Sequence, residues 1–360
     1  MFWIGAIVSL CYVPGITGAY IATQWPVLSI LLPFALWRSG PITAAHWAGL
    51  AFLAYAAARL PYAPIFNDGV FGLWLVFIMA GSFWLGSTVD NLRGLYAGLV
   101  LGASVSSAIA VLQAFGYSDI PRISTAPAGL YVNSVQQGMI LALVAVALVS
   151  ERMWLWLPAL APGLVLSGSR GAFIALAAGV ASVYVRGVWI LAATACAALF
   201  FLVYPLSGSD AVRMTIWNAA AHNLTWLGLG PGSFFSWAWP YNGSILYPEY
   251  AHNDALQLAF EYGIAAVLPI GIFGFVLTRT AEREWPVVVA FLVAGCYSMP
   301  LWVPVASFLG CVVAGRVVRG WALARRDSDG SGSDVLSWFA LRRRHAGTAG
   351  DGLVPVVAHH

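Results

Sequence analysis

Residues 70–88 of the chain read VFGLWLVFIMAGSFWLGST, a run that contains no charged side chain. A helix needs about 20 predominantly apolar residues to cross the hydrocarbon core of a bilayer, which is about 30 Å thick. This run is therefore long enough and apolar enough to form one membrane-spanning helix.

Similar runs follow one another over most of the 360 residues, of which 61% are hydrophobic and 9% charged. A soluble domain carries about 25% charged residues. So much apolar surface cannot be buried in one soluble core and must face lipid. The sequence predicts an all-α polytopic membrane protein with about 12 transmembrane helices. The predicted spans are about 2–22, 25–37, 43–58, 70–88, 94–115, 134–150, 153–168, 171–186, 188–206, 257–278, 285–299 and 301–315.

The positions of the basic residues predict the orientation of these spans. All 17 basic residues are arginines, and loops on the cytoplasmic side are enriched in arginine. If both termini are cytoplasmic, only four arginines face outward, namely Arg59, Arg122, Arg170 and Arg213. We expect Arg59 to do no more than reach toward lipid head groups.

The same topology divides the chain into parts. Residues 1–315 form a transmembrane domain in which 207–256 is one large external loop, rich in Gly, Pro, Trp and Tyr. Residues 316–360 contain a Gly/Ser/Asp linker between arginine clusters. We expect this segment to be a disordered, basic cytoplasmic tail near anionic lipid.

The external loop holds two histidines, of which His252 is the stronger candidate for chemistry. An imidazole at the head of a helix, beside Asn253 and Asp254, can stay neutral and act as a general base near pH 7. In the alternative reading, Asn253 or Asp254 caps the helix and His252 is only adjacent. His222 lies in a helical stretch and is expected to be solvated.

Two of the external arginines suggest an anion site. Arg170 interrupts an apolar run at an outward helix junction and is flanked by Gly168, Ser169 and Gly171, which leave space and backbone donors for an anion. Arg213 lies in the external loop. A guanidinium donates bidentately to phosphate, although either residue could instead snorkel to head groups. With a histidine, the two arginines indicate displacement of a phosphorylated leaving group by a deprotonated hydroxyl.

The sequence gives no sign of a metal or a cofactor. It contains no H-E-x-x-H pattern, and the carboxylates near the external arginines are scattered singly. Residues Gly228–Gly232 lack the Lys-Ser/Thr of a P-loop and indicate a turn. The four cysteines lie in separate apolar runs, which is typical of buried thiols.

Several short motifs resemble those of the O-antigen ligase and polymerase superfamily. Ser167-Gly-Ser-Arg-Gly-Ala172 resembles its S-R-G-A element. The external loop is similar, in order, to its R-x-x-x-W, G-x-G-x-x-x-F, A-H-N and E-x-G elements. The matching positions are Arg213 to Trp217, Gly228 to Phe234, Ala251-His-Asn253 and Glu261-Tyr-Gly263. The resemblance covers roughly 165–265.

The resemblance implies a GT-C-like, metal-independent inverting glycosyltransferase of the bacterial inner membrane. Such enzymes transfer a glycan from undecaprenyl pyrophosphate to an acceptor hydroxyl at the periplasmic face, and they need no nucleotide sugar or cofactor. His252 would be the base, and Arg170 and Arg213 would hold the pyrophosphate. The same motifs supply supporting positions at Trp217, Asn253 and Glu261.

The resemblance leaves the acceptor open. An O-antigen ligase joins the glycan to lipid A–core, a polymerase joins it to a growing repeat-unit chain, and a third class joins it to protein. The intact A-H-N and S-R-G elements favour the ligase type. Outside this family, a flippase for lipid-linked oligosaccharide would show repeated halves and charges deep within several helices. A scaffolding protein of the membrane would not need Arg170.

Overall fold

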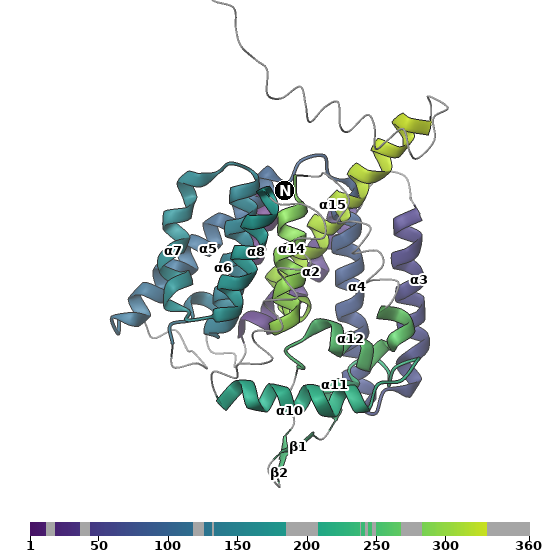
Figure 1. Ribbon diagram of the computed structural model, residues 1–360. Helices are drawn as coiled ribbons and strands as arrows, with labels where there is room; N and C mark the ends of the chain where they lie inside the picture. The colour runs from purple at the N-terminus through teal and green to yellow at the C-terminus, as the bar shows by residue number, and fades with distance from the viewer. Residues whose placement is uncertain are drawn as a thin grey trace, which may run out of the picture. The chain divides into compact units, whose positions relative to one another are not determined.

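The computed structural model describes residues 1–11, 19–36, 44–117, 126–131, 133–184, 208–237, 239–241, 244–246, 250–267 and 283–329. These residues form helices and one two-stranded hairpin, which confirms the predicted all-helical class. The chain divides into two compact units, Met1–Val318 and Arg319–His360. The arrangement below is that of the first unit (Figure 1).

The first half of the chain supplies most of the helical bundle. Its elements are α1 (Phe2–Leu10), α2 (Ala19–Leu36), α3 (Ala44–Arg59), η1 (Leu60–Tyr62), α4 (Phe66–Thr88), α5 (Arg93–Ala114), η2 (Gly129–Tyr131), α6 (Ser134–Ser150), η3 (Trp154–Trp156), α7 (Leu157–Leu166) and α8 (Arg170–Tyr184). Within the described part of the chain, α4 and α5 are the two helices long and apolar enough to cross a membrane.

The second half supplies the cap over one end of the bundle and its last two helices. Its elements are α10 (Gly208–His222), α11 (Ser233–Ser236), β1 (Trp239–Tyr241), β2 (Ser244–Leu246), α12 (Asp254–Tyr262), α14 (Trp285–Tyr297), η4 (Pro300–Trp302) and α15 (Pro304–Asp329). Strands β1 and β2 pair antiparallel, with Pro240 opposite Ile245.

Helix α6 is the centre of the bundle. Every residue of α6 except Val135 is buried, because α5, α7, α8 and α14 all pack against it. A helix with neighbours on all sides is mostly apolar on every face, as α6 is from Met139 to Val149. The side chain of Asn133 caps its first turn by accepting a hydrogen bond from the Val135 backbone N–H at 2.9 Å.

The outer faces of the bundle are apolar and exposed. On α5, Leu101, Val105 and Leu112 are exposed at helical spacing. On α7, Val165 is exposed, and Phe173 is exposed on α8. Exposed apolar side chains are more favourable in contact with lipid than in contact with water, so the pattern fits the predicted contact with lipid.

The predicted first span, 2–22, is wrong. Helix α1 ends at Leu10, and α2 begins at Ala19, before the predicted start of the second span at 25. At about 1.5 Å per residue, α1 is too short to cross a bilayer. The apolar run continues past Leu10, but Pro14 follows shortly after the end of α1, and a proline disfavours the interior of a helix because it lacks the backbone N–H.

The predicted span 257–278 is not one continuous helix. Helix α12 ends at Tyr262, and Gly263 has a φ of +88°. A glycine at positive φ is a common helix stop, since a side chain disfavours that conformation. Residues 268–282, the predicted span 188–206 and Arg122 lie outside the described residues.

The end of the chain agrees with the prediction in one respect and differs in another. The predicted pair of helices at 285–299 and 301–315 is present as α14 and α15, separated by the turn at Pro300–Trp302. However, α15 continues to Asp329, so the segment after 315 begins as a helix and not as the expected disordered tail.

The predicted external loop, 207–256, is folded into a cap. Helix α10 lies across the ends of α6 and α14, with the β1–β2 hairpin beyond it (Figure 1). A small second core holds the cap together and consists of Ile216, Ala220, Phe234, Ala251 and Phe260.

Charged side chains gather at the two ends of the bundle. Glu151, which follows α6, lies 3.3 Å from Arg283 (Oε2 to Nη1). Glu284, which precedes α14, lies 3.8 Å from Arg316 (Oε1 to Nε). The opposite ends of α6 and α14 line a cavity with Arg170 and Arg213. Among the described residues, Arg283 and Arg316, predicted to be inside, thus lie at the other end of the bundle from Arg170 and Arg213, predicted to be outside.

Candidate functional site

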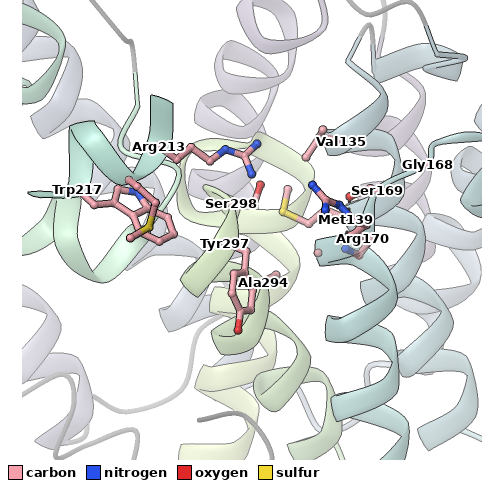
Figure 2. A pocket seen from close by; sticks show the side chains of 13 residues that line it. Val135, Met139, Gly168, Ser169, Arg170, Arg213, Trp217, Ala294, Tyr297 and Ser298 are labelled. Carbon is pink, nitrogen blue, oxygen red and sulfur yellow. Dashed lines mark hydrogen bonds between the residues drawn. The ribbon is translucent and has the colours of Figure 1, made fainter. Parts of the chain in front are cut away.

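A cavity of about 210 Å³ lies where the cap meets the bundle. Residues from four helices and the adjoining turns line it, and both arginines of the motif region take part. Figure 2 shows the guanidinium groups of Arg170 and Arg213 pointing into it from different sides. The lining residues are Val135 and Met139 of α6, Gly168 to Ala172 at the start of α8, Arg213, Met214 and Trp217 of α10, and Ala294, Tyr297 and Ser298 at the end of α14.

The tight turn before α8 places Arg170. Gly168 has a φ of +60°, which lets the chain reverse between α7 and α8. The Ser167 hydroxyl donates to the Leu164 carbonyl at 2.7 Å, and the Ser169 hydroxyl accepts from the Ala172 N–H at 3.3 Å. Arg170 is then the first residue of α8, where the backbone N–H groups of the helix also attract negative charge.

Helix α10 places Arg213 and Trp217. The two residues are four apart, so they lie on the same face of the helix, and both line the cavity. The indole Nε1 of Trp217 donates a hydrogen bond to the Ala251 carbonyl at 2.6 Å. The R-x-x-x-W element is therefore joined directly to the A-H-N element.

His252 is not one of the residues that line the cavity, but it follows Ala251, which is hydrogen-bonded to the lining residue Trp217. The backbone of His252 has a φ of +52°, an uncommon conformation for a side chain other than glycine. The preceding residue, Ala251, is held at both backbone groups, since its N–H also donates to Gln257 Oε1 at 3.0 Å. Backbone strain of this kind gathers at functional sites.

The reading of the A-H-N element as a helix cap is confirmed for Asn253. Asn253 caps α12, because its Oδ1 accepts from the Leu256 N–H at 3.0 Å. The helix cap accounts for an asparagine at position 253, but it does not account for the left-handed backbone conformation of His252. Asn253 Nδ2 also donates to the Cys296 carbonyl at 3.4 Å, which ties the element to α14.

The surroundings of His252 favour its neutral form. Burial lowers the pKa of His252 to about 4, and the positive charge of Arg213 contributes to the shift. The imidazole is therefore unprotonated at neutral pH. Among the described residues, its Nδ1 is buried without a hydrogen-bond partner.

Glu261 lies apart from the cavity and organises the cap. It is fully buried, its Oε1 accepts from Gln257 Nε2 at 3.1 Å, and its Oε2 accepts from the Gly232 N–H at 3.1 Å. Gly232 has a φ of +68°, and a Cβ there would overlap the Asp68 carbonyl. The E-x-G element, through Glu261, and the G-x-G-x-x-x-F element, through Gly232, are therefore joined by a hydrogen bond.

Two further predicted residues can be placed. Arg59 does more than reach toward lipid head groups: its Nη2 donates to the Gly228 carbonyl at 2.6 Å, and its guanidinium lies 4.2 Å from the Tyr62 ring centre. The expectation for Arg59 was therefore wrong. His222 is exposed at the end of α10, and its Nδ1 donates to the Asn218 carbonyl at 2.7 Å, as expected for a solvated helical residue.

Sequence reasoning missed the contribution of α6 and α14 to the cavity. Val135, Met139, Tyr297 and Ser298 lie outside the matched motifs. One signal was present, since Tyr297 and Ser298 are polar residues directly before Met299-Pro300, where a helix must break. Among the described residues, no three His, Cys, Asp or Glu side chains are grouped as a metal would require.

The electrostatic link between Arg213 and His252 can be measured directly. In histidine-labelled protein, NMR titration should show His252 protonating near pH 4. Arg213→Gln should raise that pKa, but not to the ordinary value of about 6.5, because burial is the larger cause. Arg93→Gln, at the other end of the bundle, should leave the titration unchanged. Equal pKa values in wild type and Arg213→Gln would contradict the link.

No protein-family model and no curated protein matches the chain. The function is therefore argued from the motifs and the geometry of the cavity.

Proposed function

We propose that the chain is a multi-pass glycosyltransferase of the bacterial inner membrane, of the O-antigen ligase type. It transfers a glycan from undecaprenyl pyrophosphate to an acceptor hydroxyl at the periplasmic face. One observation carries the proposal. Arg170 and Arg213 come from separate motifs and line one cavity, and the lining residue Trp217 is hydrogen-bonded to Ala251, next to the neutral His252.

The cavity suits the charged part of the donor. Small-molecule sites typically measure about 300–1,000 Å³, and this cavity, at about 210 Å³, is smaller. It admits a diphosphate and leaves the glycan and the lipid outside. Two guanidinium groups supply the fork geometry that phosphate oxygens prefer, and their charge does not depend on pH.

The reaction follows from these positions. His252 takes the proton of the acceptor hydroxyl, and the resulting oxygen attacks the anomeric carbon of the glycan. The bond from that carbon to the diphosphate oxygen breaks, and undecaprenyl pyrophosphate leaves with the electron pair. Arg170 and Arg213 stabilise the charge that develops on the leaving group. Attack opposite the leaving group inverts the anomeric configuration.

The pKa of His252 depends in part on whether the donor is bound. A base works best when its pKa lies near the operating pH, and about 4 is low for that task. A diphosphate bound in the cavity offsets the charge of Arg213, one of the two causes of the shift. The base therefore becomes stronger when the donor is in place.

The membrane arrangement is supported by composition and by charge. Helices α4 and α5 can span a bilayer, and the outer faces of the bundle are apolar. The inside end carries Arg283 and Arg316, whereas the cavity lies at the end that the arginine distribution assigns to the periplasm. The partners are the lipid-linked donor, a lipid A–core or glycan acceptor and the bilayer, and no cofactor is required.

A repeat-unit polymerase and a flippase are the two alternative functions. A repeat-unit polymerase would use the same donor site, and we retain the ligase type because A-H-N and S-R-G are intact. A flippase places its charged groups near the middle of the bilayer. In the described residues, the cavity arginines lie at one end of the bundle, which favours the enzyme.

The orientation can be tested by labelling single cysteines in a variant that lacks the four native ones. Thr225→Cys, in the exposed turn after α10, should react with a membrane-impermeant maleimide in intact spheroplasts. Asp90→Cys, between α4 and α5 at the opposite end, should react only after lysis. The reverse pattern would move the cavity to the cytoplasmic side and contradict the proposal.

The role of His252 can be tested in reconstituted protein with a polyprenyl-pyrophosphate-linked glycan and a saturating acceptor. His252→Ala should lower the transfer rate by about 10²–10⁴-fold, the usual contribution of a general base. His222→Ala, which removes an exposed histidine, should transfer at nearly the wild-type rate. Wild-type product formation by His252→Ala would show that His252 is only a neighbour of the α12 cap.

The two arginines can be tested by replacing each with lysine, which keeps the charge and removes the planar fork. Because bidentate contact with phosphate is lost, Arg170→Lys and Arg213→Lys should transfer at least about tenfold more slowly than wild type. Arg93→Lys is the matched control at the other end of the bundle. If all three lysine variants transfer at the same rate, the arginines do not clamp the donor.

A further inference from the structure

We propose that Ser298 is a third binding group of the anion site, whose hydroxyl donates a hydrogen bond to a diphosphate oxygen held between Arg170 and Arg213. The inference rests on the proposed function and adds a residue that lies outside the matched motifs. It follows from the position, the burial and the hydrogen bonding of this serine.

Ser298 lies on the wall of the cavity. Figure 2 shows its hydroxyl between the side chains of Arg213 and Arg170. Only 6% of the residue is exposed, although it lines a cavity that contains two charged side chains. The residue therefore borders the space that a ligand in the cavity would occupy.

The hydroxyl has no hydrogen-bond partner among the described residues. Buried polar groups are almost always paired, so a serine in this state needs an explanation. Two buried serines of the bundle show the usual solution: Ser82 donates to the Ile78 carbonyl at 2.7 Å and Ser150 to the Val146 carbonyl at 3.0 Å, whereas the hydroxyls of Ser104, Ser233 and Ser307 resemble that of Ser298. Ser82 and Ser150 both use a carbonyl of the preceding helical turn.

The backbone explains why Ser298 differs. The residue follows α14 in an extended conformation, with φ −142° and ψ −156°. Its N–H donates to the Ala294 carbonyl at 2.8 Å, as a helical residue would, so the difference from Ser82 and Ser150 lies in the extended φ and ψ of Ser298. Because helix α14 ends here, the side chain turns from the helix toward the cavity.

The chemistry of the site selects an anion as the partner. Arg170 and Arg213 bring positive charge from α8 and α10, and Ser298 adds a neutral donor from the end of α14. Donors on three elements surround one small volume, which suits a tetrahedral phosphate better than a planar group. A serine hydroxyl can donate to a phosphate oxygen without adding charge.

The test measures binding of inorganic pyrophosphate to the purified full chain by calorimetry. Ser298→Ala should raise the Kd for pyrophosphate by roughly 10-fold to 100-fold, since a hydrogen bond to a charged group contributes this much to affinity. Ser182→Ala is the matched control, because Ser182 is buried in α8 and its hydroxyl donates to the Gly179 carbonyl.

Thermal unfolding without pyrophosphate separates binding from a structural role. Removing a hydroxyl that has no partner should leave the midpoint of Ser298→Ala unchanged or raise it. Ser182→Ala should lower the midpoint, because it loses an internal hydrogen bond. A lowered midpoint together with an unchanged Kd for Ser298→Ala would show that the serine supports the fold and would overturn the inference.

The remaining outcomes separate this inference from the proposed function. If Ser298→Ala binds pyrophosphate as wild type does, while Arg170→Ala and Arg213→Ala lose binding, the serine is not part of the site and the donor site stands. If wild-type protein does not bind pyrophosphate at all, the cavity is not an anion site. Both this inference and the proposed function are then contradicted.

Discussion

The hydrogen bonds around Ala251 and Gln257 hold the candidate site together. Trp217 of α10 donates to the Ala251 carbonyl, Gln257 of α12 accepts from the Ala251 N–H, and Gln257 also donates to Glu261. The chain of contacts ends at the Gly232 N–H. Because Ala251 is held on both sides, the next residue is fixed in its left-handed conformation. The same contacts fix α10 over the bundle and thereby place its arginine.

The charges of the cavity favour an anionic ligand. Two guanidinium groups line a cavity of about 210 Å³, and a neutral imidazole lies beside them. Like charges in a partly buried space repel one another more strongly than they do in water. An anion between Arg170 and Arg213 relieves that repulsion and satisfies the Ser298 hydroxyl. A bound anion also offsets the charge of Arg213, which lowers the pKa of His252. Anion binding therefore makes His252 a stronger base.

The extent of prediction can be judged from particular elements. Helices α4, α5, α6 and α8 lie close to the predicted spans because a long apolar run with a polar flank decides both ends. The prediction failed at Leu10 and at Gly263, where the helix ends inside an apolar run, because the length of the run was given more weight than the nearby Pro14 or the glycine itself. Arg59 was misread for a different reason: a single arginine at a helix end gives no indication that its partner is the distant Gly228 carbonyl.

The sequence by itself determined the helical class, the separation of the arginines and the residue types of the site. These properties are local, because they depend on the composition of a run or on the spacing within one helix. Only the tertiary structure decided that Arg170 and Arg213 share a cavity, that Glu261 supports a turn and that Ser298 joins the arginines. Those relations depend on how α6, α8, α10 and α14 pack, and packing brings together side chains whose separation along the chain carries no information about their distance in space.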